Sequence, residues 1–251
     1  MPARVHRREN RPCWRRAVLV GLCCLSPLEA RSITIDAWSA EQTTTVISPS
    51  GSATTVATGA GILGGEREIT LTRASGVAVT MAASGGSLAY GQIAGSVGTG
   101  TVIWDGVDGG GALDPTGLGG VDFTDAATSA VISIPLLFND LPASLRLTAY
   151  TDGTNSSQVT VALPGGIPPD PQTALTILFS SFSVLSGTGA DFSNIGAFIL
   201  EVDGSAAAGL DLEIGAVETI PTPEPRTAFL LAVGLMGLTL HARRMAADRK
   251  L

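Results

Sequence analysis

Hydrophobic and polar residues alternate along short segments throughout residues 31–220. Leu145, Leu147 and Ala149 fall on one face of an extended segment, and the same alternation recurs in later segments. Gly, Pro, Asp and Asn separate the segments, and no long 3.6-residue period interrupts them. The pattern therefore predicts strands at residues 33–38, 68–73, 77–82, 88–93, 101–104, 130–138, 144–150, 158–163, 174–179, 197–203 and 210–217.

About eleven strands without helical partners predict two packed antiparallel sheets, a jelly-roll-like β-sandwich over residues 31–219. A β-solenoid is the competing architecture, but the chain has no fixed-period repeat to support it. Asp152-Gly153 supplies the turn residues of a hairpin loop over residues 151–156. The fold class is thus all-β, with a different kind of segment at each end of the chain.

Residues 1–30 have the pattern of a secretory signal peptide. Six arginines precede the apolar run 17–25, and Ala30 offers a small residue for cleavage by signal peptidase. The run is too short to span a bilayer, and Pro27 ends the signal helix. Cleavage would remove all three cysteines, so we expect no disulfide in the mature chain. A twin-arginine signal at Arg15-Arg16 and a lipoprotein signal at Cys23 or Cys24 are alternatives whose flanking patterns do not fit.

The C-terminal end combines a proline-rich linker, residues 220–226, with an apolar helix and a basic tail, residues 227–251. At about 1.5 Å per residue the helix reaches roughly 21 to 24 Å, less than the ~30 Å hydrocarbon layer. This length suits transient retention better than a permanent anchor. The positive charge that follows predicts a cytoplasmic tail and a central domain outside the inner membrane.

Pro223-Glu224-Pro225 stands before the apolar helix, and Arg243-Arg244 stands behind it. In this order the segment resembles the PEP-CTERM sorting signal of exopolysaccharide-producing Gram-negative bacteria. The resemblance implies recognition by an exosortase-type membrane protease, cleavage near the Pro-Glu-Pro motif, and release to the cell surface or extracellular matrix. The tail continues seven residues beyond Arg244 and includes Asp248, a longer and less basic end than the usual pattern. An ordinary single-pass anchor is the alternative.

Residues 31–220 contain four arginines and eighteen acidic residues, a net charge of −14, and lack Lys, Cys and His. Such an acidic domain repels phosphate backbones, so we expect no nucleic-acid partner. The missing residue types exclude Ser-His-Asp, Cys-His, zinc-thiolate and lysine Schiff-base chemistry in this domain. Carboxylates, hydroxyls and oxygen-ligated metals are the chemistry that remains.

The glycine-rich loop 104–111 is the most conspicuous candidate site. Asp105 and Asp108 place two carboxylates on flexible backbone, and oxygen ligands of this kind bind Ca²⁺. The spacing matches no EF-hand, so a solvated acidic loop is the alternative and the metal stays unknown. Trp104 is the best candidate for stacking on a sugar ring, whereas Trp38 is expected to pack inside.

Other acidic residues offer a second grouping near the edge of a sheet, because the first and last strands of jelly rolls are often neighbours. Its members are Asp36, Glu66, Asp211 and Glu213. Arg67 lies between two glutamates and is expected to form surface ion pairs.

No motif selects one carboxylate pair for glycoside hydrolysis, so we expect no enzyme and nominate no catalytic residue. The sequence predicts a secreted, exosortase-sorted β-sandwich protein with a structural or adhesive role at the cell surface or in the exopolysaccharide matrix. Its expected partners are the two processing proteases, the inner membrane transiently, and extracellular polysaccharide. The alternatives are a carbohydrate-binding module, with or without Ca²⁺ as its one cofactor, and a carboxylate-based polysaccharide hydrolase. The short phrases 61–68 and 191–204 resemble β-sandwich regions of PEP-CTERM proteins, which in turn resemble carbohydrate-binding jelly rolls.

Overall fold

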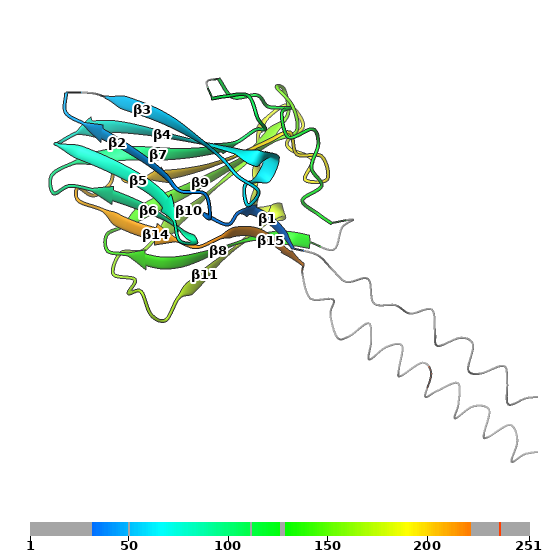
Figure 1. Ribbon diagram of the computed structural model, residues 1–251. Helices are drawn as coiled ribbons and strands as arrows, with labels where there is room; N and C mark the ends of the chain where they lie inside the picture. The colour runs from blue at the N-terminus through cyan, green and yellow to red at the C-terminus, as the bar shows by residue number, and fades with distance from the viewer. Residues whose placement is uncertain (1–31, 50, 111, 126–128, 222–235, 237–251) are drawn as a thin grey trace, which may run out of the picture. The chain divides into compact units, whose positions relative to one another are not determined.

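Two antiparallel sheets pack face to face in the computed structural model, which describes residues 32–49, 51–110, 112–125, 129–221 and 236 (Figure 1). Sheet A contains β1 (Ile33–Asp36), β2 (Gln42–Ile47), β5 (Ala78–Ser84), β6 (Ser87–Gln92), β8 (Ser129–Asn139), β11 (Thr173–Leu178), β14 (Asp211–Ile214) and β15 (Val217–Pro221). Sheet B contains β3 (Ser52–Thr58), β4 (Glu66–Ser75), β7 (Val97–Trp104), β9 (Ala143–Tyr150), β10 (Ser156–Leu163), β12 (Ser183–Ser186) and β13 (Ala197–Asp203).

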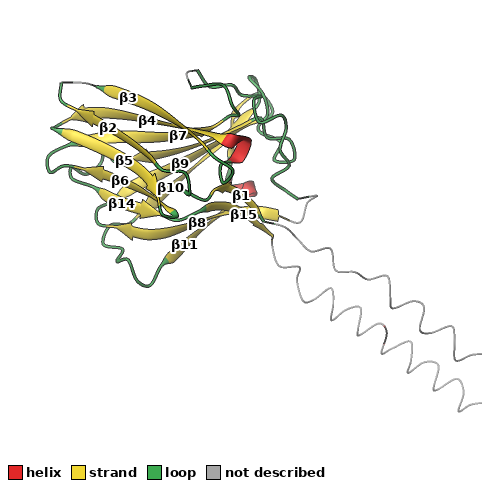
Figure 2. Ribbon diagram, in the orientation of Figure 1, coloured by secondary structure: helices red, strands yellow, loops and turns green. Residues whose placement is uncertain are grey.

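Helical structure in the described part of the chain is limited to two 3₁₀ turns, η2 (Leu63–Gly65) and η3 (Phe179–Ser181), and to Met236 (Figure 2). No helix among these residues is long and apolar enough to cross a bilayer. The predicted signal peptide, residues 1–30, lies outside the described residues. So do the Pro-Glu-Pro motif and, apart from Met236, the predicted C-terminal helix and basic tail.

Strand order follows from a set of nested pairings. In sheet A, β6 pairs with β14, β14 with β8, and β8 with β11. In sheet B, β7 pairs with β13, β13 with β9, and β9 with β10. The partners β6/β14, β7/β13, β8/β11 and β9/β10 are nested along the chain, which is the strand order of a jelly roll. The predicted antiparallel β-sandwich is therefore confirmed.

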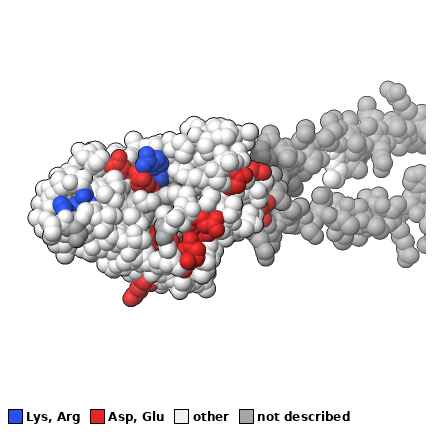
Figure 3. Space-filling model, turned by 90° about the horizontal axis from the view of Figure 1, so that it is seen from above, with Lys and Arg blue, Asp and Glu red and all other residues white. Residues whose placement is uncertain are grey.

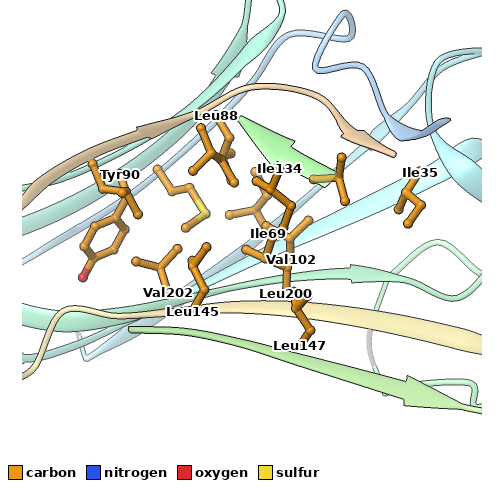
Figure 4. Close-up of a cluster of buried hydrophobic side chains, with 14 of the residues drawn as sticks. Ile35, Ile69, Leu88, Tyr90, Val102, Ile134, Leu145, Leu147, Leu200 and Val202 are labelled. Carbon is orange, nitrogen blue, oxygen red and sulfur yellow. The ribbon is translucent and has the colours of Figure 1, made fainter. Parts of the chain in front are cut away.

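The core lies between the sheets, where alternation along each strand turns the apolar side chains inward. Leu145 and Leu147 of β9 and Leu200 of β13 point from sheet B toward Leu88 and Ile134 of sheet A (Figure 4). All five are at most 1% exposed. The alternating face predicted along residues 144–150 is confirmed, because Leu145, Leu147 and Ala149 are all buried.

A buried polar cluster stands at one end of the core and corrects the prediction for Arg67. Instead of forming surface ion pairs, Arg67 is fully buried, and its Nη1 donates to both carboxylate oxygens of Asp36 at 3.0 Å. Its Nε donates to Gln42 Oε1 at 2.7 Å and its Nη2 to the carbonyl of Ala40 at 2.7 Å. The guanidinium carbon lies 5.2 Å from the ring centre of Trp38, which packs inside as predicted.

Two predicted strand boundaries are wrong for local reasons. The first strand stops at Asp36 because its Oδ1 accepts the backbone N–H of Trp38, whose φ of 53° turns the chain. The last predicted strand, 210–217, is split at Gly215, which packs against Pro135 and whose carbonyl accepts the Trp38 indole N–H. Alternation changes phase there, so Val217 rather than Ala216 is buried. Strands β2, β3 and β12 were not predicted.

Candidate functional site

Trp104 lies in the core, so the prediction that it stacks on a sugar ring is wrong. The residue is fully buried, because alternation along β7 turns Val102 and Trp104 inward together. Its ring is stacked on Phe198 with centroids 5.9 Å apart, and its indole N–H donates to Asp36 Oδ2 at 2.9 Å. The side chain therefore closes the polar cluster around Arg67 and offers no face to a ligand.

Asp105 is also buried and organises the loop that follows β7. Its Oδ2 accepts the backbone N–H of Asp114 at 2.8 Å. Burial raises the pKa of Asp105, and the hydrogen bond from the Asp114 N–H opposes this rise. The negative charges of Asp108, Asp114 and Glu66 raise the pKa further. The role shown for Asp105 is thus structural, whereas Asp108 is exposed.

Asp108 does meet other carboxylates, but not the ones that the sequence grouped with it. Ligand oxygens of Glu66, Glu68 and Asp108 lie within 4.8 Å of one another, the one such acidic group of three among the described residues. Glu66 Oε1 also accepts the backbone N–H groups of Asp108 and Gly109, at 3.3 and 3.0 Å. Three carboxylates supply part of the six to eight oxygens that Ca²⁺ takes, so peptide carbonyls or water must supply the others.

The predicted grouping of Asp36, Glu66, Asp211 and Glu213 is not formed. Asp36 is held in the core by Arg67, and Glu66 begins a strand of sheet B. Asp211 and Glu213 lie on β14 of sheet A instead. The first and last strands are indeed neighbours, since β1 pairs with β15, but that ladder does not include β14.

Asp211 and Glu213 line a groove of about 400 Å³ on the outer face of sheet A. Both side chains point away from the core, because the alternating residues Leu212 and Ile214 point into it. Phe138 on β8 is opposite Glu213, and its ring forms an apolar part of the lining. Phe138 is half-buried, so part of its surface is available to a ligand.

Small residues of β5 and β6 form much of the rest of the groove, whose lining also includes Tyr90 and Leu212. On β6, Ala89 is opposite Glu213 and Gly91 is opposite Asp211. On β5, Ala82 is opposite Ala89 and Thr80 is opposite Gly91, so two rows of small residues run across the strands. A Cβ atom at Gly91 would lie 3.1 Å from Asp211 Oδ1, so the missing side chain leaves room beside this carboxylate. The groove has the size of a small-molecule site.

The electrostatics of the groove are acidic. Burial raises the pKa of Asp211, and the negative charge of Asp140 adds to the rise. The two residues are in contact, because the backbone N–H of Asp211 donates to Asp140 Oδ1 at 2.8 Å. Carboxylates accept hydrogen bonds from hydroxyl groups, and an aromatic ring covers an apolar face. The arrangement therefore fits a neutral, hydroxyl-rich ligand with apolar patches, and a chain of sugars has this chemistry.

Comparison with known proteins gives distant structural similarities. The sequence matches no protein-family model, and no curated protein matches it. A family 11 carbohydrate-binding module of a cellulosomal cellulase from Clostridium thermocellum is similar in structure, with 11% identity over 78% of this chain and 98% of the module and a TM-score of 0.38. The family 11 module in complex with a β-1,3-1,4-mixed-linked tetrasaccharide has 12% identity, coverages of 74% and 99%, and a TM-score of 0.34. An arabinose-bound α-L-arabinofuranosidase has 14% identity over 76% of this chain and 26% of its own, with a TM-score of 0.36. Similarities this low say nothing about what this chain binds.

Proposed function

We propose that this chain is an exported protein whose β-sandwich binds an extracellular polysaccharide in the groove of sheet A. The observation that carries the proposal is the combination of Phe138, Asp211 and Glu213 beside the small residues of β6 and β5 on one outer face. The ring would cover the apolar face of a sugar, and the two carboxylates would accept its hydroxyl groups. The small side chains of β6 and β5, on the other side of β14 from Phe138, leave space beside the carboxylates for an extended chain.

Binding without cleavage fits the groove better than hydrolysis does. Glycoside hydrolysis needs an acidic pair that flanks the scissile bond. Asp211 and Glu213 project from a single strand and so lie on the same side of the groove. We therefore propose a polysaccharide-binding or matrix role in preference to hydrolysis.

Export and sorting form the second part of the proposal and rest on the sequence at the two ends. Signal peptidase would cleave after Ala30, and an exosortase-type protease near Pro223-Glu224-Pro225 after transient retention in the inner membrane. The protein would then reside at the cell surface or in the exopolysaccharide matrix. The intact mass of the secreted protein tests this proposal, and a surface form that retains residues beyond Pro225 would contradict it.

Affinity electrophoresis of the full chain through the exopolysaccharide of the producing bacterium tests the groove. We expect Phe138→Leu, Asp211→Asn and Glu213→Gln each to lose most of the retardation, because the first removes the aromatic ring and the other two remove a charge without changing the shape of the side chain. Glu218→Gln is the matched control, since Glu218 lies on β15, outside the groove lining. Equal retardation of all four variants and the unmodified chain would overturn the proposal. Release of reducing ends during incubation would favour hydrolysis instead.

Calcium dependence is measured by running the same gels with Ca²⁺ and with EDTA. Retardation lost in EDTA would assign a role to Glu66, Glu68 and Asp108, and Asp108→Asn should then reproduce the loss. Unchanged mobility in EDTA would show that the groove acts without the metal.

A further inference from the structure

One flank of the sandwich is open, where the edge of sheet A meets the edge of sheet B. β11 pairs only with β8, and β12 pairs with β10 only as far as Gln158, so the outer edges of β11 and of residues 159–163 are in no ladder of the described chain. A groove of about 490 Å³ lies between them, lined by residues 159–162 of β10, residues 174–177 of β11 and Ser181. We call this region, residues 156–163 and 173–186, the β10–β11 flank.

The opposite flank shows how the same sandwich closes when its edges are complete. There Gln42 on β2 donates to the carbonyl of Thr55 on β3 at 2.9 Å and to its hydroxyl at 3.0 Å. The hydroxyl of Thr44 is hydrogen-bonded to that of Thr55 as well. Side chains of sheet A thus bond directly to sheet B along that flank. Between β10 and β11, by contrast, lies a groove whose lining is mostly apolar, with Thr160, Thr176 and Ser181 as its polar members.

The β10–β11 flank is also nearly free of charge. Residues 156–190 contain one charged residue, Asp170, although the domain has a net charge of −14. The opposite side, seen from above β3 in Figure 3, carries several groups of acidic side chains. Leu178, Val184 and Leu185 are 48%, 61% and 50% exposed. Edge strands are usually protected from pairing by Lys, Pro or inward-pointing charges, and β11 and β12 carry none of these residues.

We propose that the β10–β11 flank binds a second copy of this chain, with the two β11 strands paired antiparallel about a two-fold axis. Two copies of so acidic a domain repel each other over most of their surface, and this flank is a place where they can approach without like charges. An isologous contact places the same edge on both sides, so each β11 offers the N–H and C=O groups that the other lacks. Pairing would also cover Leu178 and the exposed side chains of β12.

Cysteine cross-linking in the full chain tests this pairing. Cys13, Cys23 and Cys24 are the only cysteines and are replaced by Ser. Single cysteines are then introduced as Ala174→Cys, Thr176→Cys and Leu178→Cys, along the outward face of β11. Three positions are used because the proposal does not specify which residues of the two β11 strands lie opposite each other. Thr45→Cys is the matched control, since Thr45 is exposed on β2, the other edge strand of sheet A. We expect at least one β11 variant to give about tenfold more disulfide dimer than the control, because a shared edge holds the two thiols at high effective concentration.

A charge substitution gives an independent measurement. Thr176→Lys places a positive charge on each of the two paired edges and should convert the protein to single copies in sedimentation velocity, whereas Thr45→Lys should not. Both variants are run in the same detergent, so any association through the terminal segments affects them equally. Equal cross-linking of the β11 variants and the control would overturn the proposal. A single-copy mass with the β11 amides still protected from hydrogen exchange would assign the flank to a segment of the same chain, and would overturn it as well.

Discussion

Replacement of Arg67 by methionine is the sharpest test of how this sandwich is stabilised. Methionine keeps the length and much of the apolar volume of the side chain but removes every hydrogen bond donor. Asp36 would retain the Trp104 indole N–H and the Trp38 backbone N–H, but it would lose the cation that lies 3.0 Å from its oxygens. Gln42 Oε1 would also lose its donor.

The expected destabilisation follows from the burial of both charges. Asp36 and Arg67 are each 0% exposed, and removal of one partner of a buried pair costs about 3–5 kcal/mol. For a domain of this size that corresponds to a fall in Tm of about 6–20 °C. Arg146→Met is the matched control, because Arg146 pairs with Glu201 at the surface, where its side chain is 45% exposed. Such pairs contribute about 0–1 kcal/mol.

Urea unfolding of the full chain, followed by tryptophan fluorescence, measures both variants, since Trp38 and Trp104 lie beside the cluster. The pH dependence gives a second readout. Burial raises the pKa of Asp36 above 3.8 even with Arg67 present, and loss of the guanidinium should raise it further. Because the folded pKa then exceeds the unfolded one by a wider margin, Arg67→Met should lose more stability than the unmodified protein as pH rises above about 4. Equal destabilisation by Arg67→Met and Arg146→Met, or a deficit that does not shrink toward pH 4, would refute the reasoning.

Three further predictions concern single side chains. Trp104→Phe removes the hydrogen bond to Asp36 and should lower the unfolding free energy by about 1.5–3 kcal/mol. Its retardation by polysaccharide, measured on gels at 20 °C or below, should stay unchanged because the ring is buried. Gly100→Val should destabilise by about 1–3 kcal/mol in thermal unfolding, because even a Cβ there would overlap Met81 Cε. Asp152→Ala should destabilise the 151–156 hairpin. The pKa of Asp152 is lowered to about 2 by hydrogen bonds from Thr154 and Asn155, so its contribution is complete above pH 3.8 and disappears as pH falls toward 2; acid titration of both proteins checks this window.

Much of the fold could be predicted because the strands that form the core alternate strictly. The segment Leu145–Ala149 shows the pattern clearly. The hairpin loop that follows was also predicted, although Asp152 holds it by accepting the backbone N–H groups of Thr154 and Asn155 and Gly153 does not take a positive φ. β2 and β3 were missed because their outward residues are mostly threonines and their inward residues include Gln42 and Thr44, so hydrophobic contrast is weak. The β-branched threonines were the signal that could have identified them.

The site was harder to predict because it depends on which strands become neighbours. Asp105 and Trp104 looked functional from their place beside a glycine-rich loop, yet alternation along β7 buries Trp104 and the loop folds back onto Asp105. The outward direction of Asp211 and Glu213 was predictable from the alternating leucines beside them. Their meeting with Phe138 was not, because β8 and β14 are more than seventy residues apart in sequence and are joined only by the sheet.

The two proposals together predict that pairing strengthens polysaccharide binding. A two-fold axis perpendicular to sheet A, as antiparallel pairing of two β11 edges within one sheet requires, puts both grooves on the same face of the dimer. One polysaccharide chain could then occupy both grooves, and linked sites can raise apparent affinity by about 10²–10⁴ without any new contact. Thr176→Lys should therefore weaken retardation, although Thr176 does not line the sheet A groove. The added positive charge by itself would instead strengthen binding of an acidic polysaccharide. Thr54→Lys controls for the charge itself, because Thr54 is exposed on β3 of sheet B and lies outside the lining of the sheet A groove. If Thr176→Lys yields single copies that are retarded as strongly as the dimer, the grooves act independently and pairing serves assembly alone.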